Sequence, residues 1–178
     1  MKKKFIPLIC LFVSPLSLAD WSIGLDYAVL KDDYILSDEF SSNILLLQGG
    51  YHYPINEQFY VSTQSSILLH SDSEQGIFSF SDFESDIDEI KLDSFFSQDI
   101  RMGFNVTQSF SVYGGLVYAD VSLLFSGAGS LISKREESAI DILFGLEWNP
   151  INKVFFDASF SDTGDLGSVL KFGIKYRL

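Results

Sequence analysis

The sequence has almost no cysteine and no long apolar run. Its single cysteine, Cys10, lies close to the amino end, so the rest of the chain has no thiol and no disulfide framework to explain its stability. No uninterrupted apolar stretch reaches the roughly 20 residues that a transmembrane helix needs. A disulfide-stabilised domain and a helical membrane protein are therefore both excluded.

Positive charge is also scarce. The chain has 12 Lys and Arg residues against 24 Asp and Glu, and its formal net charge is -12. This balance argues against a nucleic-acid partner, because the phosphates would be repelled. The 178 residues suffice for one domain, and no linker or low-complexity tract divides them.

Residues 1–19 are predicted to be a cleaved signal peptide. Three lysines at positions 2–4 precede an apolar stretch, and residues 17–19 form a small-x-small cleavage site. Cys10 does not follow a small residue, so the pattern of a bacterial lipoprotein signal is missing. Cleavage before Asp20 would remove three lysines and no acid, which leaves 9 basic and 24 acidic residues, or a net charge of -15.

What the chain does have, over residues 20–178, is a repeated alternation of apolar and polar residues. In the last segment Leu170, Phe172 and Ile174 share one side, whereas Lys171 and Lys175 share the other. Because side chains alternate across a strand, such a ribbon has one apolar and one polar face. Seven further segments alternate in the same way: 21–29, 45–53, 59–67, 96–105, 110–119, 139–148 and 154–161.

The connections between these segments alternate in length. Those around Asn56, Thr107 and Asn152 are tight turns, whereas the connections are expected to be long and polar at 32–42, 71–92 and 126–137. Short periplasmic turns opposite long outer loops are typical of transmembrane barrels. We therefore predict an all-β fold, an eight-stranded antiparallel up-and-down transmembrane β-barrel with strands of about 9 to 11 residues.

One outward aromatic side chain per strand is predicted at the periplasmic end. Such a girdle places amphipathic rings at the level of the lipid headgroups. Its members are Trp21, Tyr53, Phe59, Phe104, Phe110, Trp148, Phe156 and Tyr176. A soluble barrel with an apolar ligand cavity is the alternative, but here the small and polar face suits the inside of a narrow barrel.

Two motifs carry a resemblance to a known family. Residues 111–118 are similar to a fifth-strand pattern, and Lys171, Gly173, Tyr176 and Leu178 resemble the carboxyl-terminal signal that the barrel-assembly machinery reads. The chain thus resembles the small eight-stranded outer-membrane barrels typified by OmpX and the OmpA membrane domain. It departs from them in ending with Leu178 where phenylalanine is usual. The family includes structural barrels and adhesins, so the resemblance predicts a class more than a function.

Acidic and basic side chains are nearly matched on the inward face. They are expected to pair in the lumen, since an eight-stranded barrel is only wide enough for side chains to fill it. This predicted charge network consists of Asp26, Asp99, Arg101, Asp141, Glu147, Asp157, Lys171, Lys175 and Arg177. A salt-bridged plug is favoured, and a narrow gated pore is the alternative.

The sequence has two histidines, and one of them raises an enzymatic alternative. His52 is expected in the lumen, near Arg177. His70 is expected at the outer rim, where barrel enzymes that modify lipid A or phospholipids place a serine and a histidine. Ser66 or Ser122 could approach it from another strand. Catalysis is not predicted, because no serine is suitably placed beside His70.

The second long loop, 71–92, is densely acidic. Its spacing does not match a calcium loop, so a solvated acidic loop is expected and no metal or cofactor is predicted. The apolar alternation at 77–80 indicates that the flanking strands continue above the membrane, with Phe78, Phe80 and Phe83 as an adhesive edge that could pair with another protein's strand. The acids are Asp72, Glu74, Asp82, Glu84, Asp86, Asp88, Glu89 and Asp93.

These features predict a monomeric protein of the Gram-negative outer membrane, surrounded by lipid and inserted by the barrel-assembly machinery. Its expected role is structural, or surface interaction and adhesion through a partner that binds loop 71–92. The lipid-modifying enzyme and the narrow pore remain alternatives.

Overall fold

The computed structural model describes residues 20–32, 40–78, 87–127, 130–162 and 167–178. Within this part of the chain there are nine strands, and no helix is long and apolar enough to cross a membrane. The predicted signal peptide lies outside the described residues. The strands are β1 Asp20–Asp32, β2 Phe40–Pro54, β3 Phe59–Ser71, β4 Ser73–Phe78, β5 Ile87–Asn105, β6 Phe110–Gly127, β7 Ser130–Ile151, β8 Val154–Asp162 and β9 Ser168–Arg177.

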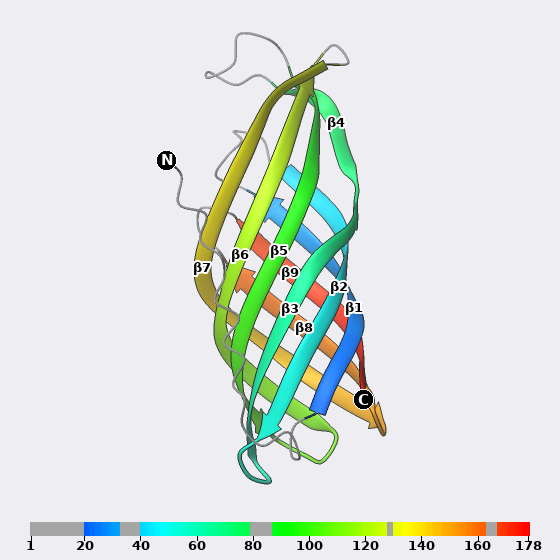
Figure 1. Cartoon of the computed structure of the whole chain (residues 1–178), viewed down its shortest axis with the longest axis vertical. Coiled ribbons are helices and arrows are strands. Elements are labelled where there is room, and N and C mark those ends of the chain that lie inside the picture. Colours follow the sequence, from blue (N-terminus) through cyan, green and yellow to red (C-terminus); the bar gives the residue numbers. More distant parts are fainter. Residues whose placement is uncertain (1–19, 33–39, 79–86, 128–129, 163–166) are drawn as a thin grey trace.

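Antiparallel pairing closes the sheet into a barrel (Figure 1). Strands β1 and β9 pair with each other, and β3 pairs with β5. Strand β4 follows β3 directly and pairs with the upper part of β5, so it extends one wall and adds no place to the closed ring. The predicted eight-stranded up-and-down barrel is therefore confirmed, with β4 as an additional outer segment.

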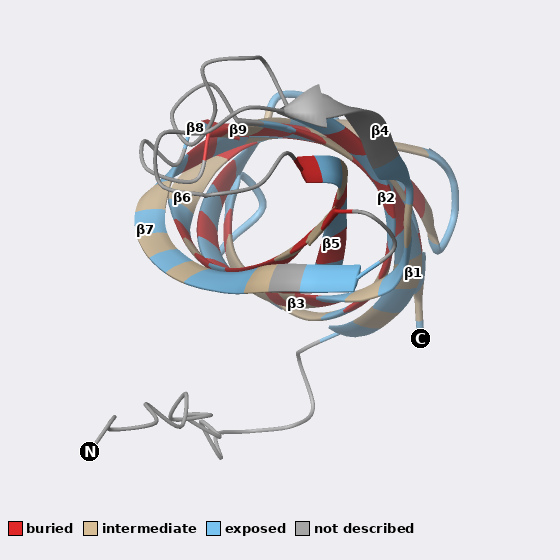
Figure 2. Ribbon diagram, turned by 90° about the horizontal axis from the view of Figure 1, so that it is seen from above, coloured by how far each residue is buried: buried red, intermediate tan, exposed pale blue. Residues whose placement is uncertain are grey.

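The inward and outward faces follow the alternation in the sequence. Asp26 and Asp99 are fully buried inside, whereas Ile100 and Ile140 on the outer face are 62% and 72% exposed. Viewed along the barrel, buried and exposed residues alternate around the ring (Figure 2). A continuous apolar outer surface around a closed ring of strands is the arrangement that a lipid bilayer requires.

Several strands are much longer than predicted. Strands β5, β6 and β7 have 19, 18 and 22 residues, and their upper parts rise beyond the other strands (Figure 1). The prediction of a long polar loop at 126–137 was wrong, because β6 and β7 stay paired up to Gly127 and Ser130. Most of loop 71–92 is likewise β4 and the start of β5, which confirms the predicted continuation above the barrel.

Two β-bulges change which side chains face inward. An extra residue at Leu69 leaves both Leu69 and His70 exposed, and an extra residue at Asp93 allows both Leu92 and Phe95 to point inside. A bulge shifts the alternation by one residue and bends the strand. Simple period-two counting from Phe96 would have placed Leu92 on the lipid side.

Candidate functional site

The half of the lumen nearer the tight turns at 55–58 and 106–109 holds a cluster of ion pairs centred on Arg101 of β5. The guanidinium binds Asp99 with two hydrogen bonds of 2.8 Å and donates a third, of 3.1 Å, to Asp157 of β8. It also lies 4.6 Å from the ring centre of Tyr113, whose hydroxyl donates to Asp157. All four side chains are buried, so each charge depends on its partners in place of water.

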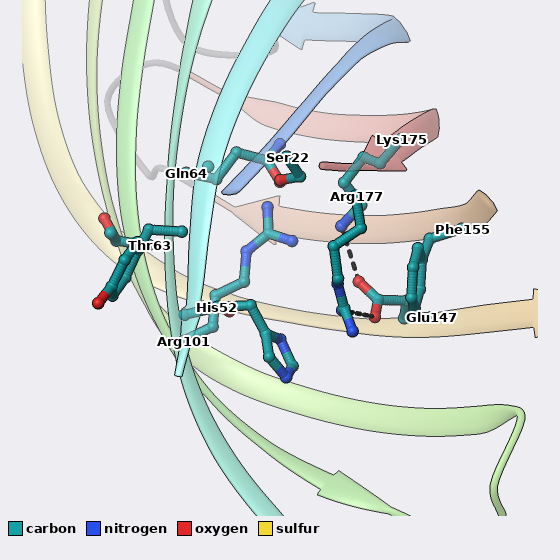
Figure 3. Close-up of a pocket in the computed structure, with 12 residues that line it drawn as sticks. Ser22, His52, Thr63, Gln64, Arg101, Glu147, Phe155, Lys175 and Arg177 are labelled. Atoms are coloured by element: carbon teal, nitrogen blue, oxygen red, sulfur yellow. Dashed lines mark hydrogen bonds and ion pairs between the residues drawn. The ribbon is translucent and has the colours of Figure 1, made fainter. Parts of the chain in front are cut away.

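The cluster continues toward the same rim of the barrel through β9. Lys175 lies 2.9 Å from Glu147 and 3.4 Å from Asp157. Arg177 lies 3.6 Å from Glu147 and 3.8 Å from Asp20, and its guanidinium covers the ring of Phe155. Figure 3 shows Lys175, Arg177 and Glu147 turned toward one another inside the barrel. We call the connected set Asp99, Arg101, Glu147, Asp157, Lys175 and Arg177 the ion-pair network.

Three of the predicted charges lie outside this network. Asp26 accepts a hydrogen bond of 3.2 Å from Gln64, and Lys171 is buried nearby; within the described residues neither has an ion-pair partner within 4 Å. Asp141 is half-buried, and its carboxylate accepts from the backbone N–H of the next residue. Sequence reasoning missed Tyr113 and Gln64, since neither carries charge at neutral pH.

The rings of two tyrosines pack over glycines on the neighbouring strands. Tyr60 lies directly opposite Gly103, and Tyr113 lies directly opposite Gly145. A Cβ at Gly103 would lie 2.0 Å from the Tyr60 ring, and one at Gly145 would lie 2.4 Å from the Tyr113 ring. The glycines thus let the aromatic rings lie flat against the barrel wall, which leaves room for the ion-pair network.

A small polar pocket lies beside the network. Its volume of about 20 Å³ suffices for about one water molecule, which is far too small for an open channel. His52 and Arg177 both line it (Figure 3), as the sequence predicted for their positions. The His52 ring packs on Tyr60 at 4.3 Å between centres.

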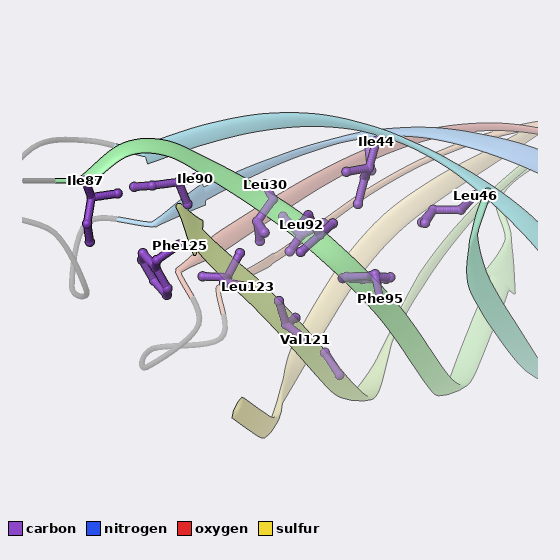
Figure 4. Close-up of a cluster of buried hydrophobic side chains, with 13 residues drawn as sticks. Leu30, Ile44, Leu46, Ile87, Ile90, Leu92, Phe95, Val121, Leu123 and Phe125 are labelled. Carbon is purple, nitrogen blue, oxygen red and sulfur yellow. The ribbon is translucent and has the colours of Figure 1, made fainter. Parts of the chain in front are cut away.

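The outer half of the lumen is apolar, which the sequence reasoning did not anticipate. The cluster of buried apolar side chains there comes from β1, β2, β5, β6 and β9 (Figure 4). We call it the apolar cluster: Ala28, Leu30, Ile44, Leu46, Ile87, Ile90, Leu92, Phe95, Ala119, Val121, Leu123, Phe125 and Val169. The signal was present at the inward positions 28, 30, 44 and 46, but the bulge at Asp93 hid it on β5.

On the outer surface, the eight aromatic residues of the predicted girdle face away from the lumen, and seven of them are exposed while Phe110 is half-buried. Phe59 and Phe104 pack at 5.2 Å between ring centres, and Trp148 and Phe156 at 5.8 Å.

The half-polar outer face of β3 has a structural explanation. Ser65 donates to the Gln98 carboxamide at 2.5 Å, and Gln98 donates to Thr63 at 2.6 Å. The amide also donates to two backbone carbonyls, so these groups need no partner from outside. Gln98 and the polar outer residues of β3 thus satisfy one another's hydrogen bonds on the lipid-facing side.

His70 does not form a serine–histidine site with the serines considered. Its side chain is 74% exposed and lies 3.7 Å from Asp72, which is 60% exposed. Ser66 and Ser122 are buried, and neither hydroxyl has a hydrogen-bond partner among the described residues. The β3 bulge turns His70 outward and Ser66 inward, so the two side chains lie on opposite faces of the wall.

The extended parts of β4, β5, β6 and β7 form a four-stranded ribbon that continues one wall of the barrel upward, comprising residues 73–78, 87–95, 120–127 and 130–142 (Figure 1). Seven members of the apolar cluster, all on β5 and β6, lie on the inner face of this ribbon. Strand β8 meets β7 only from Leu143 downward. No described strand pairs with the outer edge of β7 between Ser130 and Ile142.

Much of the predicted adhesive edge cannot be placed, because Phe80 and Phe83 lie outside the described residues and Phe78 is described only as part of β4. Across the described chain, no three His, Cys, Asp or Glu side chains are grouped closely enough to hold a metal ion.

Neither a family model nor a curated protein sequence matches this chain. Solved structures do. Ail, the attachment invasion locus protein of Yersinia pestis, crystallised with the heparin analogue sucrose octasulfate, is similar with a TM-score of 0.57 and 20% identity over 90% of this chain and 97% of Ail. Neisserial surface protein A has a TM-score of 0.55 at 14% identity, over 90% of this chain and 99% of that protein.

The outer membrane protein OprG of Pseudomonas aeruginosa is similar with a TM-score of 0.50 and 10% identity, over 90% of this chain and 96% of OprG. At these identities the similarity concerns the fold alone. It agrees with the closed ring of strands and with the apolar outer surface. The chain therefore has the fold of the small eight-stranded outer-membrane β-barrels.

Proposed function

We propose that this chain is a surface-binding protein of a Gram-negative outer membrane, and that its ribbon binds a positively charged partner outside the cell. The observation that carries the proposal is the open edge of β7 from Ser130 to Ile142. An edge strand presents unpaired N–H and C=O groups to which an extended segment can add as a further strand. Below Leu143 both edges of β7 are paired, so the barrel serves as the anchor.

The charge of the ribbon determines the kind of partner. Its sequence carries eight acidic residues against three basic ones, Lys91, Lys134 and Arg135. Two of these bases are already held by acids within the ribbon, because Lys134 lies 3.0 Å from Asp93 and Arg135 binds Glu137. Ail was crystallised with a sulfated ligand. The acidic excess here disfavours such a polyanion and favours a basic segment.

The proposal also includes how the protein is exported, how it is inserted and whether it is a monomer. Residues 1–19 direct export, the carboxyl-terminal residues Lys171, Gly173, Tyr176 and Leu178 are read during insertion, and the folded barrel is a monomer in lipid. The outward position of Tyr176 and Leu178 and the inward position of Lys171 are consistent with that signal. A non-catalytic role is supported by the solvent-facing position of His70.

The test uses the absence of cysteine after Cys10. Ser138→Cys on the β7 edge strand and Ser94→Cys on the central β5 would each be labelled with the same polyethylene-glycol maleimide, since both serines are exposed. Binding of an alternating Lys–Thr peptide to the barrel in lipid nanodiscs would then be measured, with a Glu–Thr peptide as the charge control.

We expect the Lys–Thr peptide to bind the unlabelled protein and the Ser94 conjugate, and to lose at least tenfold in affinity for the Ser138 conjugate. Equal binding to both conjugates, or equal binding of the Glu–Thr peptide, would contradict the proposal.

A further inference from the structure

On four adjacent strands, the inward-facing side chains change from polar to apolar toward the outer end of the barrel. Each strand carries a polar inward residue, and the next inward residue toward the outside is apolar. The pairs are Asp26 and Ala28 on β1, Gln48 and Leu46 on β2, Ser66 and Leu68 on β3, and Ser97 and Phe95 on β5. This boundary lies directly below the apolar cluster.

The polar side of the boundary holds buried atoms without protein partners. Gln48 and Ser66 are direct cross-strand neighbours, and so are Ser66 and Ser97, so the three form a continuous row. Both amide atoms of Gln48, both serine hydroxyls and one carboxylate oxygen of Asp26 lack a hydrogen-bond partner among the described residues. Each of these four residues is at most 2% exposed. Leaving so many buried polar atoms unpaired would be strongly destabilising, because each has lost its hydrogen bonds to water without replacement.

Asp26 and Gln48 face a common space above Gly173 of β9. A Cβ at Gly173 would meet Asp26 Oδ1 at 2.1 Å and Gln48 Nε2 at 3.0 Å. The group that satisfies this row must accept a hydrogen bond from Gln48 Nε2 and donate one to Asp26 Oδ1. A metal cation cannot accept, an anion cannot donate, and the buried Lys171 and Arg101 nearby oppose a cation. Water does both.

One side chain connects this row to the pocket beside the ion-pair network. Gln64 lines the periplasmic pocket and donates to Asp26, so it belongs both to the pocket and to the boundary. On the opposite side the apolar cluster closes the lumen, since its side chains are at most 4% exposed.

We propose that Asp26, Gln48, Ser66 and Ser97 form a buried water-binding site at the centre of the barrel. Water enters it from the periplasmic pocket past Gln64, and the apolar cluster seals it from the outside. The lumen is therefore a blind, half-hydrated tube, and its barrier to ions is the apolar cluster as well as the ion-pair network.

The test measures magnetisation transfer from water to side-chain amides, using nitrogen-15 labelled protein in lipid nanodiscs. Gln48 is expected to receive magnetisation with the sign of long-lived bound water. Gln98 is the matched control, because its amide lies on the lipid-facing side and is bonded internally. No transfer at Gln48, or equal transfer at both residues, would overturn the proposal. The measurement is repeated in Ser66→Ala, so that transfer relayed by that hydroxyl is removed and transfer from water remains.

A stability measurement gives an independent readout. Gln48→Leu removes two polar atoms at nearly constant volume, so in a dry lumen it would raise the urea midpoint of unfolding. The proposal predicts a lower midpoint, because water held by Asp26 and Ser66 loses a partner. A higher midpoint for Gln48→Leu than for the unchanged protein would contradict it.

Discussion

The barrel and the ribbon are made from the same strands, but they differ in what their edges and faces contact. In the barrel each strand is paired on both sides, and the lumen is filled by the ion-pair network and the apolar cluster. In the ribbon β7 has one open edge, and most of the charged side chains described there are exposed. Both edges of every strand are therefore satisfied in the barrel, whereas the ribbon has an edge at which a further strand can add.

The largest effect is expected from removing the central cation of the barrel. Arg101→Ala leaves Asp99 and Asp157 buried without their main partner, and it should lower the free energy of unfolding by about 3 to 5 kcal/mol. Urea unfolding of the barrel refolded into lipid vesicles measures this.

The matched control for Arg101 lies in the ribbon. Arg135→Ala makes the same change of charge at a side chain that is 51% exposed, and its cost should stay within about 1 kcal/mol. Similar losses for the two variants would mean that barrel and ribbon do not differ as described.

A smaller effect is expected from crowding the tyrosine–glycine contact. Gly145→Ala places a methyl group 2.4 Å from the Tyr113 ring and 2.6 Å from a backbone oxygen, and it should cost about 1 to 3 kcal/mol. Gly49→Ala is the control, since a Cβ there has no atom within 4 Å. An equal loss of stability in the two variants would show that the Tyr113 contact is not specific.

The smallest effect on stability belongs to Lys134 of the ribbon. The hydrogen bond to Asp93 raises the pKa of Lys134, so the stabilisation is complete below the usual lysine range and is lost as pH rises through the raised value. Lys134→Ala should therefore shift the urea midpoint slightly at pH 7 in low salt, and not at all in 1 M salt, where the pair is screened. A shift that persists in high salt would point to a packing role for this side chain.

The sequence predicted the barrel well because its two faces have opposite chemistry. Alternation in 139–148 and 170–178 determines the register, since a slip by one residue would turn Phe144 or Phe172 into the lumen. The ribbon was predicted only in part. A strand above the membrane has no lipid-facing apolar side, so residues 126–137 resembled a polar loop although β7 pairs with β6 from Ser130 onward.

The lumen was also predicted only in part. Opposite charges on the inward face indicated ion pairs, and six of the nine residues join one network. Which inward charges form ion pairs with each other depends on strand tilt and on bulges. Neither can be inferred from the alternation of apolar and polar residues. The bulge at Asp93 turns Leu92 inward, and for this reason the apolar cluster could not be derived from the sequence.

The most direct test of the difference between barrel and ribbon is amide hydrogen exchange along β7 in lipid nanodiscs. From Leu143 to Trp148 the strand pairs with both β6 and β8, so every amide there should exchange slowly. Between Ser130 and Ile142 we expect alternate amides to exchange fast, because those pointing away from β6 have no partner strand. Slow exchange at every amide from Ser130 to Ile142 would show that the edge is already covered, and would contradict the binding surface proposed for it.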